Sequence, residues 1–219
     1  MTSPLEQRFN NVIKKALTGP LALHGFRKRS RVFMRRFDTL AWVIDVQRYK
    51  YNTQEEITFT VNCGIYVPRV LSLYAGLPEP ANPNSTHCCI CTRIGMLAEE
   101  PSDEWWTIQD EIQIAEDEHI TDDVRERITI YTLPFLERFP STYEVAQFLE
   151  EPRDKTDRQS RQISPHTETM ALGCAGIIRL LCGERKAATA DLARAVHCAV
   201  GTPAEEHLRN LERNFYSIT

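Results

Sequence analysis

A chain of 219 residues, of which 42% are hydrophobic and 26% charged, can bury a core without disulfide bonds and is too apolar for a disordered protein. No apolar run approaches the roughly 20 residues that span a bilayer, and the first thirty residues show no secretory signal pattern. We therefore expect a cytoplasmic protein without a membrane span, whose seven cysteines are reduced thiols.

Opposite charges are concentrated in two parts of the chain. Residues 1–50 contain eleven Lys and Arg against three acidic residues, whereas residues 99–126 contain twelve acidic residues against one basic residue. Two such regions either neutralise each other within the fold or attract a charged partner. Internal neutralisation is the simpler interpretation.

The chain is expected to begin with an amphipathic helix. Ser3, Pro4 and Glu6 form a capping box with proline at the first helical position. Apolar residues follow at helical spacing and predict a stripe that packs on a sheet. Gly19 and Pro20 predict the end of this helix.

Three β-strands are expected next, over residues 26–37, 40–48 and 57–65. In the third, apolar and polar residues alternate strictly, so that one face is buried and the other is wet or functional. The short connections imply an antiparallel meander. Residues 87–94 and 105–108 are candidates for further strands.

Helical signals dominate the second half of the chain. Thr121 is expected to cap a helix, with acidic residues in its first turn, and Pro134 is expected to kink or end it. Ser141 and Glu144 form another capping box, which opens a short helix before Pro152.

The domain boundary is predicted from a polar stretch over residues 152–164, which has the composition of a linker. It separates an α+β domain over residues 1–151 from a C-terminal subdomain over residues 165–219, which shows three helical patterns. The predicted fold class is thus α+β: an N-terminal helix on an antiparallel β-sheet, followed by helices and a C-terminal helical bundle.

Several short motifs occur in a fixed order along the first part of the chain. They are Gly25-Phe26-Arg27-Lys28, Phe59-Thr60-Val61-Asn62 with Gly64-Ile65-Tyr66, Arg93-Ile94-Gly95 and Trp105-Trp106. In this order, over about residues 5–150, the chain resembles a bacterial family known only as a domain of unknown function. Some relatives sit among toxin–immunity or defence genes, so the resemblance implies a binding role and brings no established activity.

His87, Cys89 and Cys91 are the candidate metal ligands. On a strand, these alternate residues would project from one face, where imidazole and thiolate groups suit zinc. The alternative is that cysteine serves as a small hydrophobic residue in a half-buried strand. The sequence has no phosphate-binding loop, dinucleotide fingerprint or nucleophile motif, so we expect no cofactor and assign no catalytic residues.

The polar face of the predicted sheet is the first place to expect a binding site. It would combine a polar platform with the arginines of the first strand, namely Asp45, Gln47, Thr60, Asn62, Arg27, Arg29 and Arg31. The alternatives are an ordinary solvated face and a basic strand that protects the sheet edge from other chains. Basic residues interleaved with aromatic ones also suit nucleic acid, but a pI near 5.9 argues against that partner.

The leading functional hypothesis is a non-catalytic protein-binding module, of the kind found among immunity or defence-associated proteins. Its acidic segment, with Glu116, Asp117 and Glu118, would face a basic partner such as a toxin. The rival hypotheses are a metal-assisted hydrolase that uses His87 with the two nearby cysteines, and a nucleic-acid-binding protein that uses the basic strand. The oligomeric state is not predicted.

Overall fold

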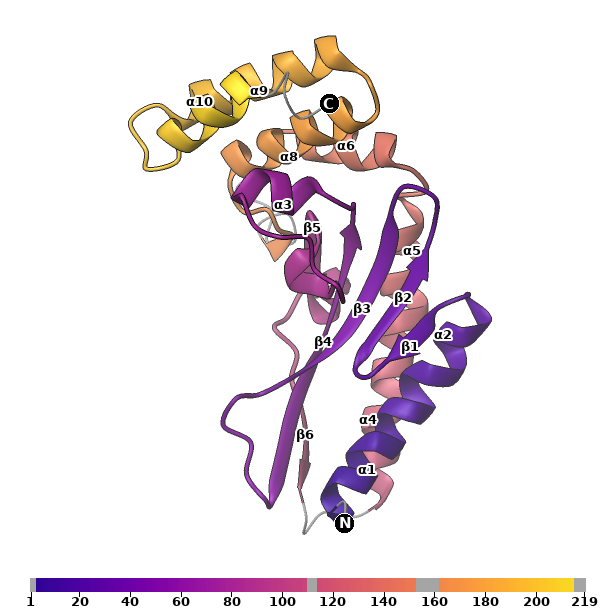
Figure 1. Cartoon of the computed structure of the whole chain (residues 1–219). Coiled ribbons are helices and arrows are strands. Elements are labelled where there is room, and N and C mark those ends of the chain that lie inside the picture. The colour runs from indigo at the N-terminus through magenta and orange to yellow at the C-terminus, as the bar shows by residue number, and fades with distance from the viewer. Residues whose placement is uncertain (1–2, 110–113, 153–161, 215–219) are drawn as a thin grey trace.

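An antiparallel β-sheet forms the centre of the computed structural model, which describes residues 3–109, 114–152 and 162–214 (Figure 1). This described part of the chain contributes six strands to the sheet. They are β1 (Arg27–Arg29), β2 (Val32–Arg36), β3 (Ala41–Arg48), β4 (Glu56–Tyr66), β5 (Ile90–Arg93) and β6 (Trp106–Gln109). Helices precede and follow the strands, so the predicted α+β fold class is confirmed.

Strands β1 to β4 lie side by side in chain order, and β5 and β6 both pair with the far side of β4. In the β3–β4 pair, Ile44 lies opposite Cys63 and Asp45 lies opposite Asn62. Neighbouring residues of a strand point to opposite faces. We call the face with Ile44 the core face and the face with Asp45 the second face.

A long N-terminal helix packs on the core face. Its parts are α1 (Pro4–Ile13), the π-helical turn η1 (Lys14–Thr18) and α2 (Gly19–Leu23). The Ser3 hydroxyl accepts a hydrogen bond from the Glu6 amide at 3.2 Å, which confirms the predicted N-cap. The prediction that Gly19 and Pro20 end the helix is wrong. Pro20 lies in the first turn of α2, where its missing N–H is tolerated, and η1 joins the two helical parts.

A second long helix runs beside the first on the same face (Figure 1). It consists of α4 (Ile114–Arg127), the π-helical turn η4 (Ile128–Thr132) and α5 (Leu133–Glu137). The prediction that Thr121 caps a helix is wrong, because its hydroxyl donates to the Asp117 carbonyl at 2.7 Å within α4. Pro134 interrupts regular α-helix but does not end the helical rod, since η4 leads into it.

Aromatic side chains join these helices to the core face. Phe9 of α1 meets Phe59 of β4 edge to face, with ring centroids 5.3 Å apart, and both rings are fully buried. Each such ring contributes about 1.5–3 kcal/mol of hydrophobic stabilisation. The Trp42 indole donates to the Phe139 carbonyl at 3.0 Å, which ties β3 to the end of the second helix.

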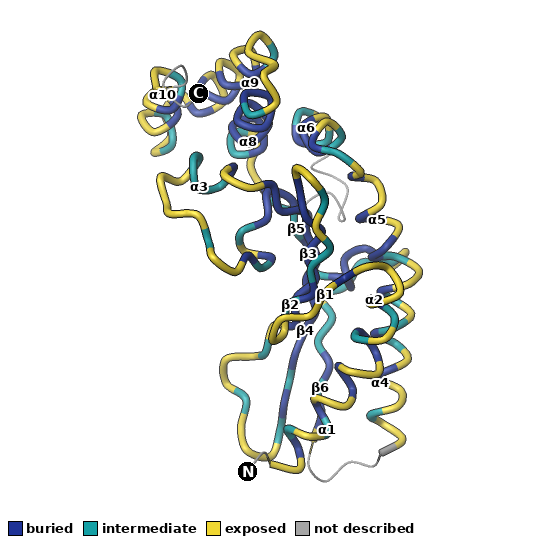
Figure 2. Tube along the Cα trace, turned by 45° about the vertical axis from the view of Figure 1, so that its right-hand side comes forward, coloured by how far each residue is buried: buried dark blue, intermediate teal, exposed yellow. Residues whose placement is uncertain are grey.

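The segment between β4 and β5 folds over part of the second face. It contains the short helices α3 (Val70–Ala75) and η2 (Ser85–His87), and η3 (Ile94–Leu97) follows β5. Under it lies a small apolar cluster of Ala41, Val43, Tyr66 and Cys88. The strands are therefore buried along the middle of the sheet, whereas the β1–β2 hairpin and the β3–β4 connection are exposed (Figure 2).

The C-terminal helices lie at one end of the sheet, above α3 in Figure 1. They are α6 (Thr142–Glu150), α8 (Glu168–Leu181), α9 (Arg185–Ala199) and α10 (Glu205–Asn214). The capping box at Ser141 and the three helical patterns after residue 165 are confirmed. No helix among the described residues is both long and apolar enough to cross a membrane.

The C-terminal helices share one hydrophobic core with the sheet. A continuous cluster of buried side chains extends from α1 to α10, and Gly173 of α8 leaves no room for a Cβ atom against the Tyr74 ring of α3. Most of the predicted linker, residues 153–161, lies outside the described residues. The division into domains at residue 152 stays a prediction.

Candidate functional site

The basic segment of the sequence is a β-hairpin. The prediction of one strand over residues 26–37 is wrong, because Ser30 adopts a positive φ of 56° and, with Arg31, forms the turn between β1 and β2. As a result, Arg27 and Arg29 point to the second face beside Met34 and Val32. Arg31 lies in the exposed turn, so the three predicted arginines do not share one strand face.

A pocket of about 690 Å³ opens on the second face beside this hairpin. Its floor is apolar, from Val32 and Met34, and the loop before η2 forms the opposite wall. The described residues that line it are Gly25, Arg27, Lys28, Arg29, Ser30, Val32, Met34, Arg36, Asn82 and Pro83. Among the described residues the lining has the side chains of three arginines and no acidic residue, so the pocket suits an anionic group attached to an apolar body.

Three guanidinium groups of this pocket have no acidic partner within the described residues. Arg27, Arg29 and Arg36 take part in none of the ion pairs or side-chain hydrogen bonds found there. Arg35, by contrast, points to the core face and stacks on the rings of Phe37 and Trp42 at 4.9 and 5.0 Å. Arginines left without internal partners are available to an external anion.

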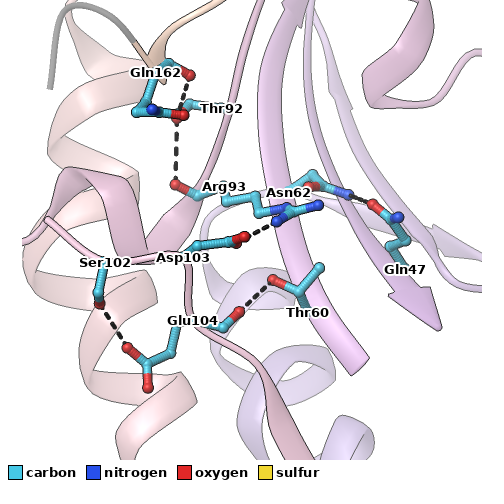
Figure 3. Close-up of polar contacts among 9 residues, drawn as sticks. All are labelled: Gln47, Thr60, Asn62, Thr92, Arg93, Ser102, Asp103, Glu104 and Gln162. Atoms are coloured by element: carbon cyan, nitrogen blue, oxygen red, sulfur yellow. Dashed lines mark hydrogen bonds and ion pairs between the residues drawn. The ribbon is translucent and has the colours of Figure 1, made fainter. Parts of the chain in front are cut away.

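Asp45 fixes the loop that forms the far wall of the pocket. One carboxylate oxygen accepts from the Ser85 main-chain N–H at 2.8 Å, and the other accepts from the Asn62 amide at 3.4 Å. Asn62 also donates to Gln47 Oε1 at 3.1 Å (Figure 3). Asp45, Asn62 and Gln47 thus form a hydrogen-bonded row on the second face, which we call the polar row. Of these three side chains, only Gln47 is exposed.

Thr60 and Arg93 hold the chain before β6 against the same face. The Thr60 hydroxyl donates to the Glu104 carbonyl at 2.7 Å, and Arg93 forms an ion pair with Asp103 (Figure 3). Arg93 also stacks on Trp105, with the guanidinium carbon 4.8 Å from the ring centroid. Thr60 is therefore a structural residue, buried to 1% exposure, and is not available to a ligand.

Glu79 anchors the base of the loop that leads to the pocket wall. Its carboxylate accepts from Ser72 Oγ at 2.6 Å, from the Arg69 main-chain N–H at 3.1 Å and from the Tyr66 hydroxyl. Burial alone would raise the pKa of Glu79, but these hydrogen bonds lower it, so the carboxylate remains charged.

The three candidate metal ligands do not come together. His87 lies in η2 rather than on a strand, and its Nδ1 accepts from the Asn84 main-chain N–H at 3.2 Å. Cys89 lies in the main core, whereas Cys91 packs against the cluster on the second face. Among the residues that the structure describes, no group of three or more His, Cys, Asp or Glu side chains is arranged to hold a metal ion.

Burial makes the cysteines near the sheet poor nucleophiles. Loss of hydration raises the pKa of Cys63, Cys88 and Cys91, and raises that of Cys89 to about 12. These thiols are protonated at neutral pH, and a thiol reacts through its thiolate. They pack as small hydrophobic side chains in this fold.

The predicted acidic surface is partly used inside the molecule. Asp117 accepts from Arg8 through both carboxylate oxygens, at 2.8 and 2.9 Å, which joins α4 to α1. Glu116 and Glu118 are exposed. Internal neutralisation is therefore found at Asp117, whereas the hairpin arginines Arg27, Arg29 and Arg36 have no such partner over residues 3–109, 114–152 and 162–214.

Sequence reasoning missed Arg36, Asn82 and Pro83 as parts of the pocket. Arg36 could have been found from strand alternation, once the turn at Ser30 had been recognised, because it shares a face with Met34. The residues of the wall reach the hairpin only through the tertiary fold, and no local pattern marks them.

In a comparison with protein families, residues 17–138 match the family described as "Domain of unknown function (DUF4304)". No curated protein and no solved structure matched the chain. The match covers more than half of the chain and contains the hairpin, the polar row, the second long helix and the last part of the first, from residue 17 onward. The resemblance inferred from the motifs is confirmed at this level: the chain belongs to the DUF4304 family of domains of unknown function.

Proposed function

We propose that this protein is a non-catalytic binding module that holds an acidic segment of a protein partner in the pocket beside the β1–β2 hairpin. The observation that carries the proposal is a set of three arginines around an apolar floor, Arg27, Arg29 and Arg36, which have no acidic partner in the part of the chain that the structure describes. A bacterial immunity or defence role is the setting that the family resemblance implies, and it stays a prediction.

The composition of the pocket favours a protein segment over a simple inorganic anion. The floor residues Val32 and Met34 are only partly buried, so apolar side chains of a partner can complete their burial. Guanidinium groups on the rim pair with carboxylates in a planar, bidentate manner. A segment with both acidic and apolar residues satisfies both parts of the site.

The two rival hypotheses differ in what they require of the structure. A hydrolase that used His87, Cys89 and Cys91 would need these side chains at one place, and they lie on different elements and faces. A nucleic-acid-binding protein could use the same arginines through phosphate contacts, and would then show binding that weakens steeply with salt. The exposed Glu116 and Glu118 of the acidic segment form a second charged surface, so variants there and in the pocket show which of the two binds the partner.

The test is capture of a partner by the tagged full-length chain from its native cells, with mass spectrometry of the bound protein. Arg27→Ala/Arg29→Ala/Arg36→Ala should lose the partner, since each charged contact removed costs about tenfold in affinity. Glu116→Ala/Glu118→Ala, which removes exposed charges elsewhere, is the matched control and should retain it.

Two results would contradict the proposal. Loss of the partner in the acidic control alone would move the interface to α4. Tight, salt-sensitive binding of a labelled 20-nucleotide oligothymidylate, abolished by the arginine variant, would assign the site to nucleic acid.

A further inference from the structure

Strand β1 is the outermost strand of the sheet at the hairpin end. All three of its residues are exposed, and within the described part of the chain its main chain pairs with β2 alone. At the opposite edge of the sheet, by contrast, the chain itself pairs with part of the outer strand. There Ser164 pairs with Cys91 of β5, with main-chain N–H to O distances of 2.7 and 3.4 Å, so the chain closes that part of the edge itself.

The hydrogen-bond pattern of the hairpin shows which groups face the open edge. The Val46 amide donates to the Arg31 carbonyl directly opposite at 2.9 Å, so alternate residues of β2 bond to β3. Val32 and Met34 then bond toward β1, where they lie opposite Arg29 and Arg27. Lys28 lies between Arg27 and Arg29, so its main-chain N–H and C=O point away from β2.

We propose that β1 accepts an extended segment of the protein partner as an additional antiparallel or parallel strand, with acidic side chains at every second position. The inference rests on the proposed function and names the conformation and pattern of the segment that it binds. The Lys28 main chain supplies one donor and one acceptor to the added strand. Arg27 and Arg29 supply the charges that its acidic side chains meet on the second face.

The charges of β1 determine which strand can be added. Basic side chains on an edge strand normally prevent pairing with other chains. Here they disfavour neutral strands and a second copy of β1, because like charges directly opposite are destabilising. A strand with acidic residues at alternate positions is instead attracted by these charges. The edge is therefore specific for an acidic strand, because it disfavours neutral and basic ones.

The opposite face of the added strand meets a different surface. The Lys28 side chain points to the core face, with its ammonium nitrogen 5.5 Å from the centroid of the Phe33 ring. The intervening residues of the partner segment lie on this side, where an apolar side chain is favoured beside the stem of the lysine. The preferred pattern is thus acidic, apolar, acidic, apolar, acidic.

The test uses the full-length protein and three labelled peptides of five glutamate and four valine residues. One alternates the two residues, one has the same composition in two blocks, and one alternates them with N-methylated main-chain amides. Fluorescence anisotropy at low salt should show binding of the first peptide and at least tenfold weaker binding of the other two. Equal binding of the alternating and N-methylated peptides would overturn the added strand.

Two variants of Lys28 distinguish the contribution of its main chain to peptide binding from that of its side-chain charge. Lys28→Pro removes the outward N–H without removing a hydrogen bond to β2, as proline is accepted at such edge positions. It should lose the alternating peptide, whereas Lys28→Ala should bind it within about threefold of the wild type. Loss in Lys28→Ala to the same extent as in Lys28→Pro would overturn the role of the main chain.

These outcomes are distinct from failure of the proposed function. If Arg27→Ala/Arg29→Ala/Arg36→Ala loses the captured partner but Lys28→Pro retains it, the pocket binds the partner and the added strand is wrong. If the arginine variant retains the partner, the proposed function itself is wrong. A protected Lys28 amide in hydrogen exchange of the peptide complex is the direct positive result.

Discussion

Arg8 of α1 and Asp117 of the acidic helix α4 are joined by two parallel hydrogen bonds of 2.8 and 2.9 Å. The Arg8 guanidinium also donates to the Gln109 carbonyl at 2.8 Å, so one side chain connects α1, α4 and the end of β6. The exposed fractions of the Arg8 and Asp117 side chains are 22% and 14%. This pair shows how part of the charge asymmetry is used inside the fold.

Arg8→Ala should lower the free energy of unfolding by about 1–3 kcal/mol, because it leaves a half-buried carboxylate without its charged partner. Urea denaturation measures the change. The matched control is Arg125→Ala, which breaks the exposed pair with Asp122 and should cost less than about 1 kcal/mol. Equal losses in the two variants would show that the Arg8 pair is an ordinary surface contact.

Asp191 is expected to make stability depend on pH. It is 5% exposed, and its surroundings are Glu150 of α6, Arg179 of α8 and Arg194 of α9. Burial, followed by the nearby Glu150 carboxylate, raises the pKa of Asp191 from 3.8 to about 6, although the two arginines oppose this. Between these pH values the folded state holds a proton that the unfolded state has released. Stability therefore falls as pH rises through this window and stays lower above it.

Asp191→Asn should remove this pH dependence. The variant should be more stable than the wild type at pH 7.5, by about 1–3 kcal/mol, and should show no such gain at pH 4. Urea denaturation at the two pH values gives the comparison, and the exposed Asp122→Asn is the control. A loss of stability in Asp191→Asn at pH 7.5 would mean that the carboxylate is charged and stabilising there.

Gly64 is required by the close approach of β4 and β5. A Cβ atom there would lie 2.5 Å from the Ile90 carbonyl oxygen and 2.9 Å from the Cβ atoms of Cys88 and Cys91. Gly64→Ala should therefore destabilise the fold by about 1–3 kcal/mol through overpacking. Gly19→Ala, at a helical position with no atom within 4 Å, is the control and should be neutral or slightly stabilising in thermal unfolding. Equal melting temperatures for the two variants would contradict the packing argument.

Asp45 is expected to support binding without touching the partner. Asp45→Ala removes the acceptor of the Ser85 amide, so the wall that contains Asn82 and Pro83 loses its attachment to β3. Partner capture should fall together with stability, by about 1–3 kcal/mol for an unpaired buried amide. Asp45→Asn keeps an oxygen at this position and should recover much of both. Full capture by Asp45→Ala would show that the wall is not needed.

The sequence predicts those parts of the fold that depend on local signals. Ser3 and Ser141 cap helices as their neighbours indicate, and the alternation in β4 identifies the residues of its core face. The opposite face is not wet over most of the strand, because Thr60 and Asn62 are buried as well. The turn at Ser30 was missed because a serine with positive φ is uncommon and no glycine or asparagine marks the position. Because of this turn, Arg35 points to the core face and stacks on Trp42, whereas Arg27 and Arg29 point to the second face.

The candidate site was predicted in part. Arg27 and Arg29 were placed on the polar face, and Asp45, Gln47 and Asn62 do form a row across it. The pocket itself depends on a loop about fifty residues further along the chain that packs over the hairpin. Such long-range packing follows from the combined burial of many side chains, which no local pattern reveals.

Each of the two long helices contains a π-helical turn just before a proline, at Pro20 and at Pro134. A π-helical turn holds one residue more than an α-helical turn, so it rotates everything after it by about 100° relative to an uninterrupted helix. The helical parts before and after the π-helical turn are thus rotated relative to each other about the helix axis. This rotation lets both parts direct apolar side chains toward the sheet. Insertion of a single residue into a regular helix would produce this arrangement. Removal of one residue from η1 should therefore restore a regular helix while turning Leu21 out of the core.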